Sequence, residues 1–258
     1  MLSANTDQVD PGCLKRGAHG DVMGYLRFKL FILVIPGFIM ISCFSRNTHA
    51  IPEGAVIRYA ENGTPFYIKG KNLSSNLDND PGFCILKKEG RYGEIVYQFL
   101  RSLDKLLKID DPYREFEITG VKTDSLAFKH IKLQQVYNGI AVWGRSISVH
   151  LNQDNQVYLF QGHYEPTLRN VDITPNLSEK EAAKRAISEA TGGEGGCRVQ
   201  ENKLFIFMVG DQTPRLAYRI TLVKGLMRRE YSFVDAGNGK ILHKLSGTPK
   251  NDSVSLPR

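Results

Sequence analysis

The clearest pattern of apolar and polar positions lies in the middle of the chain. Ile131, Leu133 and Tyr137 alternate with polar residues, which predicts a β-strand with one buried face. Asn138-Gly139 follows and predicts a two-residue type I′ turn, because both residues tolerate a positive φ. In the returning strand the apolar residues shift from even to odd positions, and a one-residue slip would turn the strand over. We therefore expect a β-bulge at Gly144.

Two amphipathic helices are predicted. Apolar residues recur every three or four positions over 92–109, and Asp110-Asp111-Pro112 should end this helix. A second helix should begin at the capping box formed by Ser178 and Glu181 and end at Gly192-Gly193. The polar run 74–82 has the composition of a turn. Strands are predicted over 55–60, 65–68, 116–121, 157–162, 203–209, 215–223, 230–234 and 240–245.

These elements predict an α+β fold with two small domains, each an antiparallel sheet packed on one helix. The expected boundaries are 51–168 for the first domain and 169–245 for the second. Residues 1–50 are expected to form a signal segment. Residues 246–258 lack apolar periodicity and are expected to form a flexible tail.

The N-terminal segment has the features of an export signal. Arg27 and Lys29 precede an apolar run over 30–44, and 48–50 offer a small-x-small cleavage site. A membrane anchor is the alternative, but a spanning helix needs about 20 apolar residues and this run contains Pro-Gly. Residues 40–43 also resemble a lipobox, so Cys43 is a candidate for lipidation. The chain is expected to be exported, either secreted or periplasmic, or attached to the cell envelope through a lipidated Cys43.

Charge and cysteine content argue against nucleic-acid binding and against a cysteine-based zinc site. The formal net charge is +7, but the basic residues are scattered and form no stripe of the kind that binds nucleic acid. Cys84 and Cys197 fall in different predicted domains, so two unpaired thiols are expected in the exported chain. No Cys-x-x-Cys or Cys/His cluster is present, which removes the usual signature of a zinc site.

The sequence shows no catalytic constellation. None of the six histidines belongs to an H-E-x-x-H motif, and Gly-x-Ser-x-Gly and phosphate-binding loops are absent. His130, His150 and His163 lie on predicted strands of one sheet. Their sequence phases differ and no carboxylate recurs beside them, so we expect no metal site. We predict no cofactor and no enzymatic activity.

The hairpin also resembles the hallmark of the fungalysin/thermolysin propeptide (FTP) domain, which runs approximately His-x-Arg-x-Gln-Gln-x-Tyr-x-Gly-x-x-Val. The residues that match are His130, Gln134, Gln135, Tyr137, Gly139 and Val142. Three residues depart from the family pattern: Lys132 replaces arginine, and Ala127 and Asn155 replace glycines. From the residues alone, Gln134 and Gln135 could orient a substrate, although a role in stabilising the sheet is favoured because buried amides need partners.

The C-terminal half resembles a PepSY module. Residues 217–220 and 231–242 resemble its Leu-Ala-Tyr and Val-Asp-Ala-x-x-Gly-x-Ile phrases, with Asp235 and Gly239 at the motif positions. In families with this pair of modules, the resemblance implies a pro-region that assists folding of a thermolysin-like metalloprotease and inhibits it. The segment after the last strand would lie across the active-site cleft of that protease.

Three hypotheses about function stay open. The chain could act in trans as a free-standing inhibitor or chaperone of a secreted thermolysin-like metalloprotease. It could instead be the truncated pro-region of such an enzyme, once joined to it in cis. The third hypothesis is a cell-envelope binding module without a protease partner. Candidate partner-binding residues are Trp143, which is either core or an interface residue, and Ser246, Pro249 and Leu256 in the tail.

Overall fold

The computed structural model describes residues 51–191, 196–208, 213–224 and 228–247, and strands dominate this part of the chain. All of these residues belong to a single unit that begins at Arg46. The fold is mixed α and β, as predicted. The expected signal segment, Cys43 and residues 248–258 lie outside the described residues. Within the described residues, no helix has the length and apolarity that crossing a membrane requires.

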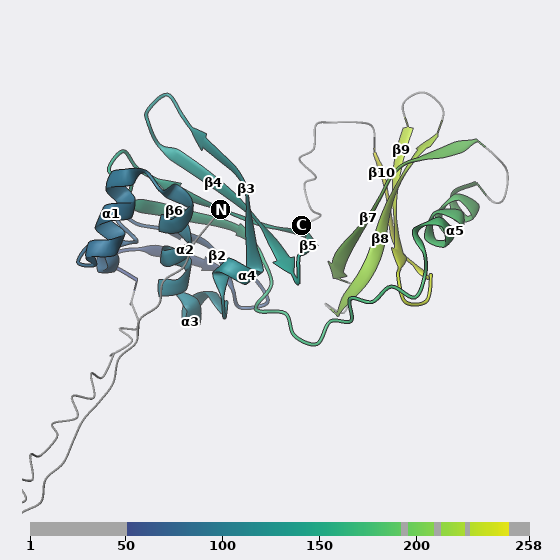
Figure 1. Ribbon diagram of the computed structural model, residues 1–258, viewed down its shortest axis with the longest axis horizontal. Coiled ribbons are helices and arrows are strands. Elements are labelled where there is room, and N and C mark those ends of the chain that lie inside the picture. Colours follow the sequence, from purple (N-terminus) through teal and green to yellow (C-terminus); the bar gives the residue numbers. More distant parts are fainter. Residues whose placement is uncertain (1–50, 192–195, 209–212, 225–227, 248–258) are drawn as a thin grey trace, which may run out of the picture. The chain divides into compact units, whose positions relative to one another are not determined.

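The first part of the chain combines short helices with six strands (Figure 1). In order, the elements are β1 (Val56–Tyr59), β2 (Pro65–Lys69), a 3₁₀ turn (Ser75–Leu77), α1 (Pro81–Glu89), α2 (Tyr92–Ser102), α3 (Asp104–Leu107), α4 (Pro112–Glu115), β3 (Phe116–Thr123), β4 (Lys129–Tyr137), β5 (Ile140–Leu151) and β6 (Val157–His163).

The second part consists of one helix and four strands. They are α5 (Glu179–Thr191), β7 (Cys197–Met208), β8 (Pro214–Lys224), β9 (Arg228–Asp235) and β10 (Ile241–Gly247). Ser178 and Glu181 form the predicted capping box, because the Ser178 amide donates to the Glu181 carboxylate at 2.8 Å and the Glu181 amide donates to the Ser178 hydroxyl at 3.3 Å.

The strands pair in the order β1-β2-β6-β5-β7-β8-β9-β10, and β4 pairs with both β3 and β5. Every pairing is antiparallel except that of β5 with β7, which is parallel and joins Val142 to Ile206. The strands at the ends of these pairings, β1, β3 and β10, each have one strand neighbour among the described residues.

The helical prediction departs from the structure in three places, two of them at aspartate–proline pairs. The run 74–82 was expected to be a turn, but α1 begins within it, because Asp80 accepts hydrogen bonds from the Gly82 and Phe83 amides at 2.7 and 3.1 Å. Pro81 occupies the first turn, where its missing N–H costs nothing. The helix predicted over 92–109 ends at Ser102 and resumes as α3. Asp111-Pro112 begins the short helix α4, with the Asp111 side chain accepting from the Tyr113 amide.

The hairpin prediction is confirmed in detail. Asn138 and Gly139 both have positive φ, at 49° and 78°. The register of β4 on β5 shifts between Gln134, which faces Ser146, and Val136, which faces Ala141. Residues 142–145 therefore lie opposite Gln135 alone and form the expected irregularity, with Gly144 at a φ of 68°. The bulge lets β5 present a new set of side chains after residue 145.

Buried apolar side chains form two clusters. The first contains α1–α3 residues such as Phe83 and Phe99 packed on Ile131 and Val149. The second contains Ala182 and Ala186 of α5 packed on the α5-facing residues of β7–β9. Val142 is fully buried in the second cluster, and Tyr137 and Ile140 pack against it. The end of the β4–β5 hairpin thus contributes to the second cluster, whereas β5 beyond the bulge contributes to the first.

Candidate functional site

The motif glutamine Gln134 fills the bulge in β5. Its side-chain nitrogen lies 2.8 Å from the carbonyl oxygen of Val142 and 2.7 Å from that of Arg145. These two carbonyls flank the part of β5 that the register of β4 skips. An amide side chain therefore supplies the donors that a regular ladder would have supplied, since buried backbone acceptors need partners. This geometry fits a role in stabilising the sheet.

Gln135 fixes the chain where it leaves β6. Its side-chain nitrogen donates to the Glu165 carbonyl at 2.8 Å, and its side-chain oxygen accepts from the Glu165 amide at 2.9 Å. The Glu165 carboxylate in turn accepts from Arg145 Nε at 2.6 Å and from Asn62 Nδ2 at 3.1 Å. Sequence reasoning missed Arg145, Glu165 and Asn62, because nothing in their spacing shows that a loop, a bulge and the end of a strand meet.

Trp143 is half-buried, and its ring contacts residues of β7, β8 and β9. Its centroid lies 5.2 Å from that of Phe205 and 5.1 Å from that of Phe233. The Arg219 guanidinium lies 4.9 Å from the centroids of Trp143 and Phe205, and it also forms an ion pair with Glu201. The bulge places Trp143 in this aromatic cluster, so the residue makes core contacts although it is only partly buried.

Asp235 and Gly239, the other motif pair, form the turn after β9. The Asp235 carboxylate accepts from the Gly237 and Asn238 amides at 2.8 and 3.1 Å, and the Gly239 amide donates to the Asp235 carbonyl. Gly239 has a φ of 75°, a conformation that L side chains rarely adopt. Their role in the described structure is to close a tight turn.

The first two residues of the predicted flexible tail belong to a strand. Ser246 and Gly247 belong to β10 and pair with Glu230 and Arg229, so the strand continues two residues into the predicted flexible segment. Backbone hydrogen bonding to β9 accounts for this extension, which the weak apolar pattern did not indicate. Pro249 and Leu256 lie outside the described residues.

Two of the three strand histidines meet, contrary to the expectation from their sequence phases. His130 and His150 are direct partners in the β4–β5 register, and their Nδ1 atoms lie 2.6 Å apart. A carboxylate is also present, since Asp124 lies 3.0 Å from His130 Nε2. Cross-strand register, rather than phase within a strand, decides which residues share a face. His163 lies apart from them and stacks on Phe66.

Among the described residues, no cluster of three or more His, Cys, Asp or Glu side chains could hold a metal ion. Burial, and then the charge of His130, lowers the pKa of His150 from 6.5 to about 4. Cys84 and Cys197 are free thiols.

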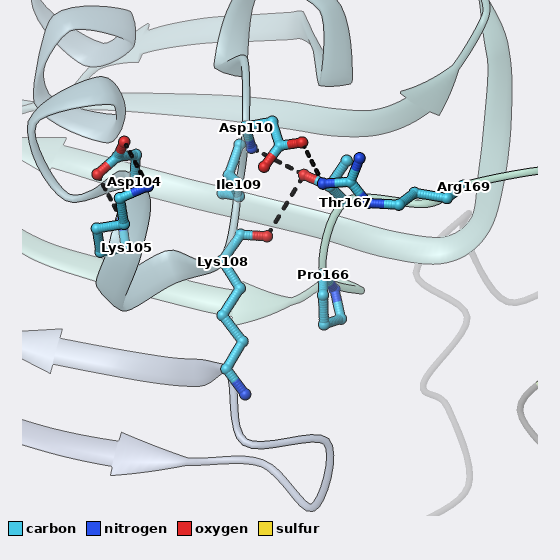
Figure 2. A pocket seen from close by; sticks show the side chains of 8 residues that line it. All are labelled: Asp104, Lys105, Lys108, Ile109, Asp110, Pro166, Thr167 and Arg169. Atoms are coloured by element: carbon cyan, nitrogen blue, oxygen red, sulfur yellow. Dashed lines mark hydrogen bonds and ion pairs between the residues drawn. The ribbon is translucent and has the colours of Figure 1, made fainter.

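A small cavity of about 260 Å³ lies between the α3 region and the chain that follows β6 (Figure 2). Its charged side chains are paired with one another: Arg169 contacts Asp110 at 2.5 Å, and Lys105 lies 3.9 Å from Asp104. Lys108 Nζ donates to the Asn62 carbonyl at 3.3 Å. Because these charges already have partners, we assign no ligand to this cavity.

Comparison with known proteins places the motif in a family. Residues 114–164 match the family model described as the Fungalysin/Thermolysin Propeptide Motif. The matched range contains β3, the β4–β5 hairpin with its bulge, and β6. The resemblance to the FTP domain is therefore confirmed for this part of the chain.

The chain is also similar to bacillolysin and neutral protease B over part of their length. Bacillolysin of Brevibacillus brevis is 31% identical over 172 residues, covering 62% of this chain and 32% of that protein. Neutral protease B of Bacillus subtilis (strain 168) is 31% identical over 215 residues, covering 78% of this chain and 38% of that protein. The chain thus spans about a third of the length of these relatives.

Among solved structures, the Bacillus megaterium YpeB C-terminal domain aligns with a TM-score of 0.35 and 12% identity, covering 70% of this chain and 71% of that one. A TM-score this low does not establish a shared fold.

Proposed function

We propose that this chain is a non-catalytic, propeptide-like protein that binds a secreted thermolysin-like zinc metalloprotease, inhibits it and assists its folding. The observation that carries the proposal is the propeptide motif over 114–164, which lies within a longer similarity to bacillolysin and neutral protease B. The partner is the catalytic domain of such a protease. The chain would need no chemistry of its own, because occupying the active-site cleft is enough to inhibit.

A rigid surface supports this role. The motif glutamines satisfy the bulge and the exit from β6, so the strands around them have little freedom to lose on binding. Preorganisation of this kind leaves more of the contact energy for affinity. Binding to the folded protease in preference to the unfolded one would also stabilise it by mass action.

We place the contact with the protease at β10 and the residues after it. β10 pairs with β9 alone among the described strands, so its other edge has backbone donors and acceptors available. An extended segment of a partner can add to such an edge by main-chain hydrogen bonds. Residues 248–258, which follow β10 directly, would then enter the cleft, and the exposed part of Trp143 is a second contact. In this proposal residues 169–245 form a PepSY-like domain, and the chain is exported.

Titration of purified residues 46–258 into a mature thermolysin-like protease, followed by hydrolysis of a peptide substrate, tests the proposal. We expect sub-micromolar inhibition that weakens at least tenfold when residues 248–258 are deleted. The deletion starts after Gly247 so that β10 stays intact. A matched control replaces 248–258 by a Gly-Ser segment of equal length, which should weaken inhibition as much as the deletion does.

The outcomes decide where the contact lies and whether the chain acts on the protease at all. Full inhibition by the Gly-Ser variant would move the contact from the tail to the folded strands. The proposal would be contradicted if the chain inhibited none of a panel of thermolysin-like proteases and did not raise the refolding yield of their denatured catalytic domains.

A further inference from the structure

His130, His150 and Asp124, here called the histidine pair and its carboxylate, form a connected polar group where β4 begins and β5 ends. The rings meet edge to face with centroids 4.8 Å apart. Asp124 lies in the turn between β3 and β4 and accepts at one oxygen from the Leu126 and Phe128 amides. Its other oxygen contacts His130 Nε2. The carboxylate therefore links the turn to the histidine pair.

The hydrogen-bond pattern identifies the protonation state. Two imidazole nitrogens 2.6 Å apart must share one proton, because two lone pairs or two N–H groups would repel each other. The Asp124 carboxylate is an acceptor, so His130 Nε2 carries a proton, and a neutral His130 then accepts at Nδ1. His150 must be the donor from its Nδ1. A neutral His150 consequently has a bare lone pair at Nε2.

The burial of that last nitrogen makes the pair sensitive to acid. His150 Nε2 is buried and has no hydrogen-bond partner within the described chain. A lone pair there is tolerated, but a proton would create a buried donor without an acceptor. If the proton instead binds His130 at Nδ1, the His150 proton must move to Nε2, with the same result. Either way of adding one proton to the two rings therefore leaves a buried donor at His150 Nε2 without an acceptor.

The charged groups around the pair act in opposite directions. Lys122 of β3 is the register partner of His130 and carries positive charge, which disfavours a second one. The Tyr158 ring of β6 lies beside His150, with centroids 6.2 Å apart. The Asp124 carboxylate acts the other way: its hydrogen bond with His130 lowers the pKa of the Asp124 carboxyl group and favours a positive charge on the pair. It does not reach His150 Nε2, which has no acceptor whichever ring takes the proton.

We propose that His130, His150 and Asp124 form a pH-dependent contact that keeps the β3–β4 turn on the end of β5 at neutral pH and opens on mild acidification. This property belongs to the chain itself, so its test does not depend on the proposed protease partner. The lowered pKa of His150 gives the same sign. Unfolded histidine binds a proton near pH 6.5, so the contribution is complete above that pH and is lost as the pH falls towards about 4.

Urea unfolding of residues 46–258 at pH 7.5 and pH 5.0 tests this, comparing the wild type with His150→Gln. We expect the unfolding equilibrium constant of the wild type to rise about tenfold more than that of the variant between these pH values; the figure is discounted from the full pKa shift because the pair is partly solvated. His163→Gln is the matched control and should follow the wild type, because His163 lies outside the pair.

NMR titration of the histidine rings in the wild type provides a second test, which does not depend on whether a substituted protein folds correctly. The His150 ring should bind its proton at least about one pH unit below the histidines of the urea-unfolded chain. The amide resonances of residues 124–130 should shift in the same pH range. Titration of His150 together with the unfolded histidines, or parallel pH dependence of the wild type and His150→Gln, would overturn the proposal.

Discussion

Ala127 adopts a left-handed backbone conformation, with a φ of 61°, in the turn between β3 and β4. Asn138, Asn155 and Asn170 share this conformation. Asparagine tolerates it because its side chain can hydrogen-bond locally, whereas alanine has no such compensation. The FTP pattern has glycine where this chain has Ala127, so the departure seen in the sequence corresponds to a strained residue in the structure.

Replacing Ala127 by glycine should therefore stabilise the protein. The left-handed conformation costs alanine about 1–2 kcal/mol, and the greater freedom of glycine in the unfolded chain returns about half of that. We expect Ala127→Gly to raise the free energy of unfolding by about 0.5–1 kcal/mol, measured by urea denaturation at pH 7.5. Ala183→Gly within α5 is the control and should lower the free energy by about 1 kcal/mol. Equal losses for both variants would contradict the strain at Ala127.

At the scale of elements, the bulge in β5 depends on one side chain from the neighbouring strand. Gln134 provides the donors for two carbonyls in the stretch of β5 that the register of β4 skips. Gln134→Leu keeps the approximate size of the side chain and removes the donors. We expect it to lower the free energy of unfolding by about 2 kcal/mol, since unsatisfied buried acceptors each cost about 1–3 kcal/mol. The measurement is urea denaturation followed by far-UV circular dichroism.

Gln161→Leu is the matched control for this change. Gln161 lies on β6 and is exposed, so its loss should change the free energy of unfolding by no more than about 0.5 kcal/mol. If Gln134→Leu lowers the free energy of unfolding as little as the control does, water replaces the amide in the bulge. That result would contradict the stabilising role of the motif glutamine.

The hairpin and α5 were predictable because their signals are local. Asn138-Gly139 is sufficient for its turn, and the capping box at Ser178 is sufficient for its helix start. The start of α1 was missed because Asp80-Pro81 suits both a turn and a helix N-terminus. The meeting of His130 with His150, and of Gln135 with Glu165, depends on register and on contacts between distant segments. Neither is encoded in the spacing of residues along one strand.

At the scale of the whole molecule, β5 belongs to both hydrophobic clusters. Val142 is buried with the α5 residues, and Val149 is buried with the α2 residues. A single strand shared by two cores couples their stabilities, because loosening either core disturbs the same backbone. Trp143 reinforces the coupling through its contacts with Phe205 and Phe233.

The chain contains one tryptophan, so its fluorescence reports directly on this contact. We expect urea transitions followed by Trp143 fluorescence and by far-UV circular dichroism to coincide in the wild type. Trp143→Ala should lower the midpoint and split the circular dichroism transition in two, because half-burial of this ring contributes about 2 kcal/mol. Trp143→Phe, which keeps an aromatic ring in place, should retain one transition. Separate transitions in the wild type would show that the cores are independent.

The shared strand also has a consequence for the order in which the protein is made. Synthesis completes β3 to β6 before β7 emerges, so the first cluster can form on the nascent chain. The hairpin end with Val142 and Trp143 then stays exposed to solvent until Phe205 and Phe233 have left the ribosome. During this interval the chain displays an apolar hairpin of the kind that aggregates or binds chaperones. Any fragment that ends before β7 would keep this surface exposed permanently.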